Sequence, residues 1–305
     1  MKILAISGGR AKGNNELLLR AALNAAREVC SAQVELVRLH DLNLKRCVGC
    51  ETCMRGLTTG GDGKCVIRDD DMDWLTRRIG GADALLIASP VYDLIPTGSM
   101  INLVNRALGI GKQFQQDCRA NPKVGAVIAL GGSDWINLAE PIADLTLCNL
   151  SKSAVVVDRL IVGHNPAPAM VVLDDAVMER ARLLGRRVAQ ALLKREAGQP
   201  FGYEGDAGVC PVCHCKLLEL RGGDQVSCPY CDARGRLAAI NGQIRVEWDP
   251  DSMEKNRFTV YGETEHRKDI GQGHRRAGEN QALIQERARA LDEFGGAVIR
   301  PERQG

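Results

Sequence analysis

Short apolar runs alternate with amphipathic stretches along the first 195 residues of this 305-residue chain. The runs are KILAIS, VELVRL, ALLIAS, VGAVIAL and AVVVDRLIV, and helical periodicity follows them at 15–30, 70–79, 97–107, 135–147 and 176–193. Runs such as ALLIAS are apolar throughout rather than at every second position, which is typical of strands buried on both faces. This alternation predicts an α/β domain with a doubly wound, five-stranded parallel sheet.

Ligands of a doubly wound sheet bind beyond the carboxyl ends of its strands, so the loops there form the candidate site. Three of these loops are rich in small residues: SGGRAKGNN, SPVYDLIPTG and GGSDW. The first offers a hydroxyl at Ser7, a cation at Arg10, and amides at Asn14 and Asn15, a combination that can hold a phosphate. It matches neither GxxxxGK[ST] nor GxGxxG, and a plain glycine-rich turn is the alternative interpretation.

The sequence resembles the flavodoxin-like NADPH-dependent FMN reductases and, within them, the iron-sulfur flavoproteins. ISGGRAKGNNE is similar to the family's opening loop, SPVY to its second flavin loop, and CxxCxxC followed by CVIRDDDM to its cysteine segment. The resemblance covers about the first 195 residues. It implies an FMN site formed by Ser7, Arg10, Asn14, Asn15, Ser89, Pro90, Val91, Tyr92, Gly131, Gly132 and Ser133. The family's loop has one more residue between Ser7 and Arg10, which leaves open which hydroxyl meets the phosphate.

The cysteine segment contains Cys47, Cys50, Cys53 and Cys65, four of twelve cysteines in the chain. In a reducing compartment, grouped cysteines more often bind metal or perform redox chemistry than form disulfides. Four thiolates are the usual ligands of a [4Fe–4S] cluster, and CxxCxxC lets one loop provide three of them. The family's gap before the last ligand is short, whereas eleven residues separate Cys53 from Cys65. Free or zinc-binding thiols are therefore the alternative.

A second group consists of two CxxC pairs, Cys210 with Cys213 and Cys228 with Cys231, which are fourteen residues apart. This spacing resembles a zinc ribbon, in which the metal replaces the core that a short module lacks. A rubredoxin-like iron site uses the same four thiolates, and CPYC resembles one of its knuckles, so iron is the alternative to zinc. The nearby His214 and Cys215 are interpreted as neighbours of the site rather than as ligands.

Composition and turn signals divide the rest of the chain. We expect a flavodoxin-like domain at 1–195 with its cysteine loop at 47–65, a glycine-rich linker at 196–208, a zinc-ribbon-like β-module at 209–248, and a polar arm at 249–305 with a helix at 279–294. No run approaches 18 apolar residues, the start MKILAISGG lacks the pattern of a secretory signal, and the net charge is only +2. We therefore expect a cytoplasmic protein that has no membrane partner.

The expected function is an FMN-dependent oxidoreductase with a [4Fe–4S] cluster, which passes electrons from NAD(P)H or a ferredoxin-type donor through FMN to a small acceptor. No His-Asp or paired-carboxylate constellation is evident, so the catalytic residues stay unknown; Tyr92 and Trp135 are candidates to cover the ring. The family resemblance implies a homodimer or homotetramer. The alternative is a regulatory protein whose ribbon contacts nucleic acid or protein, but offset charges and a single aromatic residue in the ribbon argue against nucleic acid.

Overall fold

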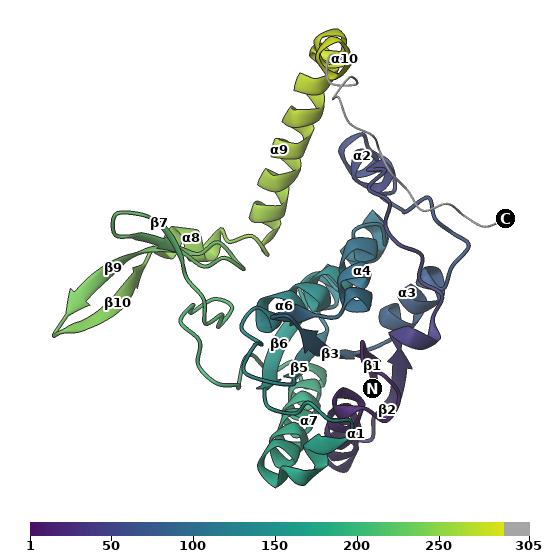
Figure 1. The fold of residues 1–305 in the computed structure, drawn as a ribbon, viewed down its shortest axis with the longest axis vertical. Helices are drawn as coiled ribbons and strands as arrows, with labels where there is room; N and C mark the ends of the chain where they lie inside the picture. The colour runs from purple at the N-terminus through teal and green to yellow at the C-terminus, as the bar shows by residue number, and fades with distance from the viewer. Residues whose placement is uncertain (290–305) are drawn as a thin grey trace. The chain divides into compact units, whose positions relative to one another are not determined.

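The fold is that of a computed structural model in which residues 1–289 are described. The chain forms two compact units, the first from Met1 to Thr259 and the second beginning at Val260. Figure 1 shows both units with many of their helices and strands labelled. Among residues 1–289, no helix is long and apolar enough to cross a membrane.

A parallel sheet forms the centre of the first unit. Its strands are β1 (Lys2–Ser7), β2 (Gln33–Arg38), β3 (Ala84–Tyr92), β5 (Val124–Gly131) and β6 (Val155–Val162), and a short β4 (Ile95–Pro96) pairs antiparallel with β3. The order is β2-β1-β3-β5-β6, so the chain reverses its direction of travel across the sheet between β1 and β3. This confirms the predicted doubly wound five-stranded sheet, whose order is that of flavodoxin-like proteins.

Helices cover both faces of this sheet (Figure 1). One face carries α1 (Asn14–Val29) and α7 (Asp175–Glu196); the other carries α3 (Met72–Gly80), α4 (Gly98–Ala107) and α6 (Ala139–Leu150). Other helical segments between residues 1 and 196 are α2 (Thr52–Thr58), α5 (Lys112–Ala120) and the 3-10 turns η1 (Leu39–Asp41) and η2 (Met170–Leu173). Both α2 and α5 were missed in the sequence analysis; they are short, no residue of α2 is buried, and Cys118 is the buried residue of α5.

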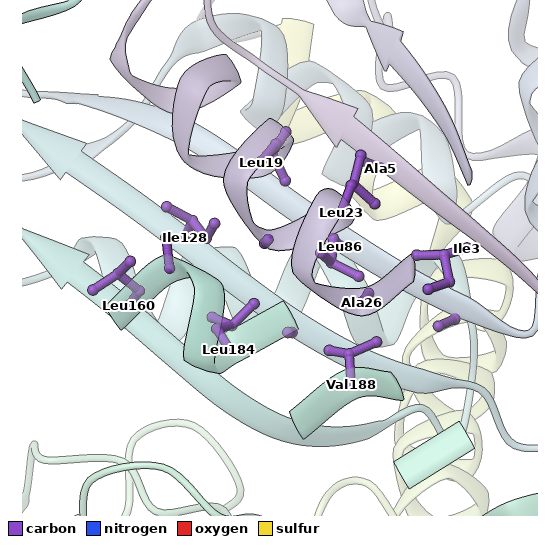
Figure 2. Close-up of a cluster of buried hydrophobic side chains, with 14 of the residues drawn as sticks. Ile3, Ala5, Leu19, Leu23, Ala26, Leu86, Ile128, Leu160, Leu184 and Val188 are labelled. Carbon is purple, nitrogen blue, oxygen red and sulfur yellow. The ribbon is translucent and has the colours of Figure 1, made fainter. Parts of the chain in front are cut away.

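The core beneath α1 and α7 shows why the strands are apolar throughout. Leu19 and Leu23 of α1 and Leu184 and Val188 of α7 point at Ile3, Ala5, Leu86, Ile128 and Leu160 of the sheet, as Figure 2 shows. The two helices also touch each other, since a Cβ at Gly185 would lie 1.9 Å from the Ala22 carbonyl oxygen. Alternate residues of the same strands, including Leu4, Ile6, Leu85 and Ile87, fill the second core on the opposite face.

The second cysteine group belongs to a small antiparallel sheet. Its strands are β7 (Glu219–Gly222), β8 (Gln225–Ser227), β9 (Arg234–Ile240) and β10 (Gln243–Trp248), in the order β10-β9-β8-β7, and the short α8 (Pro250–Glu254) follows. The turn between β9 and β10 has positive φ at Asn241 (51°) and Gly242 (74°), as the Asn-Gly signal predicts. The segment leading into this module lies along the large sheet, where the Glu204 N–H donates to the Val157 carbonyl (2.8 Å).

The second unit consists of α9 (Val260–Glu279) and α10 (Gln281–Arg289). Its first helix includes the polar, glycine-containing stretch that precedes the expected helix at 279–294. Pairs one turn apart support it, such as Glu263 with Arg267 and Glu265 with Lys268. The end of the expected helix, and of the arm expected to reach 305, lies outside the described residues.

Glu16 is a buried acid in the first turn of α1. Its carboxylate, which is shielded from solvent, accepts hydrogen bonds from Arg38 Nε (2.6 Å) and Arg20 Nε (2.9 Å). The bond from Arg38, aided by that from Arg20, holds the pKa of Glu16 at about 2 although burial acts in the opposite direction. A carboxylate with a lowered folded-state pKa stabilises the fold above its unfolded pKa and loses that contribution as pH falls through the folded value.

Glu16→Gln is therefore expected to lower the free energy of unfolding by roughly 2–3 kcal/mol at pH 7, with the deficit shrinking as pH falls from 4.5 towards 2. Urea unfolding at pH 7 and pH 3 measures it. The exposed Glu179 of α7, which also pairs with two arginines, is the control; Glu179→Gln should change stability by less than about 0.5 kcal/mol. A Glu16→Gln deficit of equal size at both pH values would contradict this account.

Candidate functional site

Loops at the carboxyl ends of the parallel strands enclose a cavity of about 620 Å³, a size typical of a cofactor site. Of the residues expected at FMN, seven line it: Arg10, Asn14, Asn15, Pro90, Val91, Tyr92 and Gly132. Ser7 and Ser89 are fully buried beneath the surface of the cavity, and Gly131 and Ser133 are not among its lining residues. The structure therefore brings the three predicted loops together at one site.

The cavity also has walls that the sequence analysis did not identify. They are provided by His40, Ser99, Leu130, Asn165, Pro166, Ala167 and Pro168, while Thr97 and Gly98 of the wall are the last residues of the second predicted loop. His40 follows β2 and the 165–168 segment follows β6, two strands whose end loops were not inspected for a site. The sequence contained the information needed to include these two loops, because all parallel strands of one sheet end at the same edge, where the ligand binds.

The loop after β1 is shaped to accept an anion. The Gly9 N–H donates to Ser7 Oγ (3.2 Å), so this hydroxyl folds the loop from below. A Cβ at Gly8 would lie 3.1 Å from both Thr97 Oγ1 and Met100 Cε, which leaves little room for a side chain. The residue before α1 is Gly13, which gives the helix no side-chain cap, so the first N–H groups of α1 are available to a ligand.

Three side chains at the start of α1 differ in their availability. Asn14 is engaged in the wall: its Nδ2 donates to the Asn165 (3.1 Å) and Ala167 (2.9 Å) carbonyls, and its Oδ1 accepts from the Val171 N–H (3.1 Å). Asn15 is only 3% exposed, yet its Oδ1 has no hydrogen-bond partner among the described residues. Arg10 is exposed and has no carboxylate partner within residues 1–289. A phosphate would satisfy the free cation and the helix N–H groups together, whereas the Asn15 Oδ1, an acceptor, would need a donor.

The first cysteine group lines a second, smaller cavity. Cys47, Cys50, Cys53 and Cys65 meet there with Arg106 and Gly109, because α2 takes up part of the gap before Cys65 and returns the chain to its start. The Cys65 N–H donates to the Gly109 carbonyl (2.9 Å), and a Cβ at Gly109 would lie 2.7 Å from the Cys65 Cβ. The long gap therefore does not keep the four thiols apart.

The thiols of this group differ in environment. Cys47 and Cys50 are exposed, whereas Cys53 and Cys65 are half-buried. The Thr52 hydroxyl and N–H lower the pKa of Cys50, while burial raises that of Cys53. Within residues 1–289, the second cysteine group has all four sulfurs within 4.8 Å of one another. The sulfurs of the first group are not that close together. Wider spacing suits a multi-iron cluster, whose corners are separate metal ions.

The second group has the geometry of a single-ion site. The sulfurs of Cys210, Cys213, Cys228 and Cys231 all lie within 4.8 Å of one another. Two contacts measure 3.5 Å, Cys210 Sγ to Cys231 Sγ and Cys213 Sγ to Cys228 Sγ. Tetrahedral ligands at about 2.3 Å from zinc are separated by about 3.8 Å, so the four sulfurs are already close to that arrangement.

The thiol protons of this group are shared unevenly. Hydrogen bonds between the sulfurs, from Cys213 first, lower the pKa of Cys210 to about 7, while those from Cys210 and Cys228 raise the pKa of Cys213. Four thiolates this close would repel one another without a cation between them. Cys215 is buried beside the group, and the ring of His214 stacks on Tyr203 with centroids 4.2 Å apart, so neither belongs to the ligand set.

The cysteine module is anchored to the large sheet by a buried ion pair. Arg159 of β6 bonds to the Asp144 carboxylate through Nε (2.8 Å) and donates from Nη2 to the Cys213 carbonyl (2.6 Å). Burial, only partly offset by Arg159, raises the pKa of Asp144 to about 6. The Tyr230 hydroxyl donates to Cys148 Sγ (3.1 Å), whose pKa burial raises to about 11. Both contacts reach α6, which starts beside the cavity loops.

Comparison with known proteins agrees with this geometry. The family model of NADPH-dependent FMN reductases matches residues 1–142. An iron-sulfur flavoprotein of Methanocaldococcus jannaschii is 31% identical over 207 residues, which is 63% of this chain and 97% of the relative. A flavone synthase of Aspergillus candidus is 29% identical over 330 residues, which is 100% of this chain and 99% of the relative.

A solved structure of a flavone reductase has a TM-score of 0.76 to this chain at 24% identity, over 99% of this chain and 100% of the other. The likeness in fold therefore extends beyond the sheet domain. The cavity lies at the β1/β3 switch point, where such a sheet binds its ligand, and the matches to FMN reductases and iron-sulfur flavoproteins give the class of protein, a flavin-dependent oxidoreductase. The chain belongs to the family of the iron-sulfur flavoproteins, whose flavin domain, here residues 1–142, matches the NADPH-dependent FMN reductase model, and FMN is the cofactor that this family supports.

Proposed function

We propose that FMN binds in the large cavity with its phosphate at the start of α1. Arg10, the side-chain Nδ2 of Asn15 and the first N–H groups of α1 hold the phosphate, while Asn14 and the hydroxyl of Ser7 keep the surrounding loops in shape. Pro90, Val91 and Tyr92 lie along one side of the ring, and Gly132 with the 131–133 loop along the other. His40, Thr97 and Ser99 of the cavity wall add polar contacts.

The metal sites have separate tasks in this proposal. The cavity of Cys47, Cys50, Cys53 and Cys65 holds a [4Fe–4S] cluster, which exchanges single electrons. The tight set at Cys210, Cys213, Cys228 and Cys231 holds zinc, which has no redox couple and stabilises a module too small for a core of its own. The expected division at 1–195, 196–208, 209–248 and 249–305 remains our domain assignment.

The substrate we propose is a flat aromatic compound of the flavone type. Tyr92 lines the large cavity and is 67% exposed. Trp135, which is 64% exposed, lies on the loop after β5, which the Leu138 N–H to Leu94 carbonyl bond (3.2 Å) joins to the loop after Tyr92. Exposed aromatic rings on adjoining loops offer faces for stacking, which is the observation that carries the proposal. It agrees with the names of the flavone synthase and flavone reductase relatives.

FMN supplies hydride transfer to or from a carbon–carbon bond conjugated with a carbonyl when it is bound. The chain's own residues orient the two rings and exclude water between them. The donor that we propose is NAD(P)H or a ferredoxin-type protein, and a homodimer or homotetramer in the cytoplasm is our assignment for the assembly.

A nucleic-acid role for the ribbon finds little support in its charges. Arg221 pairs with Glu219 (3.0 Å), Arg234 with Asp232 (2.9 Å) and Arg236 with Asp224 (3.7 Å). Phosphate binding would have to break these pairs. We therefore retain the oxidoreductase proposal for the whole chain.

Arg10→Ala is expected to weaken FMN binding about tenfold or more without changing the stability of the FMN-free protein, because a charge-assisted bond to phosphate contributes roughly 1.5–3 kcal/mol. Asn14→Ala is the matched variant. It loses three hydrogen bonds within the protein and should destabilise the FMN-free form by about 1–3 kcal/mol. Fluorescence titration with FMN and urea unfolding separate the two effects; unchanged FMN affinity in Arg10→Ala would place the phosphate elsewhere.

Metal analysis of anaerobically purified protein should find about four iron atoms and one zinc per chain. Cys65→Ser should lose the iron and keep zinc and FMN, whereas Cys228→Ser should lose zinc, loosen the module and keep iron and FMN. Each variant thus serves as the control for the other. A single iron that remains in Cys65→Ser, disappears in Cys228→Ser and cycles during turnover would make the second group a rubredoxin-like relay instead.

Protein reduced under argon and mixed with flavone should regain the absorbance of oxidised flavin as the substrate gains two hydrogens. Tyr92→Ala and Trp135→Ala should each raise the flavone concentration for half-maximal rate by roughly three- to tenfold, since aromatic stacking contributes about 0.5–1.5 kcal/mol. Leu220→Ala, an exposed apolar residue of β7, is the control. Flavin that oxygen reoxidises but flavone does not would refute the substrate class.

A further inference from the structure

Arg106 is a buried cation beside the first cysteine group. It lies in the last turn of α4, is 2% exposed, and lines the same small cavity as Cys47, Cys50, Cys53 and Cys65. Arginine is almost never buried to this degree unless its donors are used.

Two of its three nitrogens have partners on the segments that flank the cysteines. Arg106 Nη1 donates to the Lys45 carbonyl (2.7 Å) and to the Asp70 carboxylate, and Nη2 also donates to Asp70 (3.3 Å). Asp70 in turn accepts from the N–H groups of Lys45 (3.1 Å) and Met72 (3.1 Å). Burial opposes ionisation of Asp70, but Arg106 outweighs it and the pKa of Asp70 falls below its usual value. The charged pair therefore joins the chain before the cysteines to the chain after them.

The third nitrogen, Nε, is buried and has no hydrogen-bond partner among the described residues. The backbone keeps Cys65 close to this group: the Gly109 N–H donates to the Arg106 carbonyl (3.0 Å), and the Cys65 N–H donates to the Gly109 carbonyl (2.9 Å). An N–H buried without a partner is costly, so it needs an acceptor in the cavity.

We propose that Arg106 is a positioning residue for the cluster, whose Nε–H group donates a hydrogen bond to the Cys65 thiolate and thereby raises the cluster's reduction potential. The proposal rests on the [4Fe–4S] cluster of the proposed function. A donor to a ligand sulfur stabilises the more negative, reduced cluster more than the oxidised one. The same bond holds Cys65 in place across the long gap from Cys53.

If Arg106 had only a structural role, its ion pair with Asp70 would be enough, and the cluster potential would not depend on the Nε–H group. The double substitution of Arg106→Met with Asp70→Asn tests the difference, because it removes the donor and leaves the net charge of the site unchanged. The matched control is Arg195→Met with Asp83→Asn, which removes a partly buried pair of similar geometry (2.7 Å) from α7, on the opposite face of the sheet. Arg106→Lys is the third variant, since it keeps the positive charge beside Asp70 and removes the Nε donor.

The measurement is an anaerobic redox titration of each protein followed by electron spin resonance, with the flavin potential as an internal reference. We expect the ratio of reduced to oxidised cluster at the wild-type midpoint to fall about tenfold in the Arg106→Met, Asp70→Asn protein, which is about 59 mV. Arg106→Lys should shift in the same direction, and the control pair and every flavin potential should stay unchanged.

A cluster potential unchanged in both Arg106 variants would overturn the inference while leaving the cluster itself established. Wild-type potential in Arg106→Lys alone would also overturn it, because charge without the Nε–H would then suffice. If the double variant fails to fold or loses its iron, Arg106→Lys decides. Wild-type protein without iron would instead refute the proposed cluster, and this inference with it.

Discussion

Parallel strands cannot be joined by a tight turn, and this constraint organises the first unit of the protein. Each connection must cross a face of the sheet, so α1 and α7 cover one side and α3, α4 and α6 the other. All five strands then end at one edge, where only loops remain. The cavity is the result: its walls come from the ends of β1, β2, β3, β5 and β6, although these segments are far apart in the sequence.

Helix α4 connects the two candidate redox sites. Gly98 and Ser99 at its start line the large cavity, and Arg106 in its last turn lines the cavity of the first cysteine group. Ten residues of α-helix span about 15 Å, so one rigid element sets the spacing of both sites. On the neighbouring helix α6, Asp144 receives the guanidinium of Arg159, which also bonds to a metal-site carbonyl. The cysteine module is thus attached to the framework that carries the flavin loops.

Much of this could be predicted from the sequence because burial on both faces leaves a strong signal. ALLIAS and VGAVIAL have no polar face, and Asn241-Gly242 between two apolar runs specifies a hairpin.

Other features depend on tertiary contacts. No local pattern shows that Asn14 bonds to a loop more than 150 residues away, or that the Ser7 hydroxyl turns inward to Gly9. From the sequence alone, Arg106 would be interpreted as a basic residue at the end of an amphipathic helix. The fold is needed to show that it lines the same cavity as four cysteines. The polar α9 has few apolar positions, so its helix could not be read from periodicity.

In the function proposed here, one chain binds a two-electron flavin, a one-electron cluster and a zinc ion that takes no part in redox chemistry. An anaerobic reductive titration with dithionite, followed by visible absorption and spin resonance, counts these electrons directly. The account predicts about three electron equivalents per chain, two taken up by the flavin and one by the cluster. Uptake of only two, with all absorbance changes assigned to flavin, would show that the first cysteine group holds no cluster and would contradict the account.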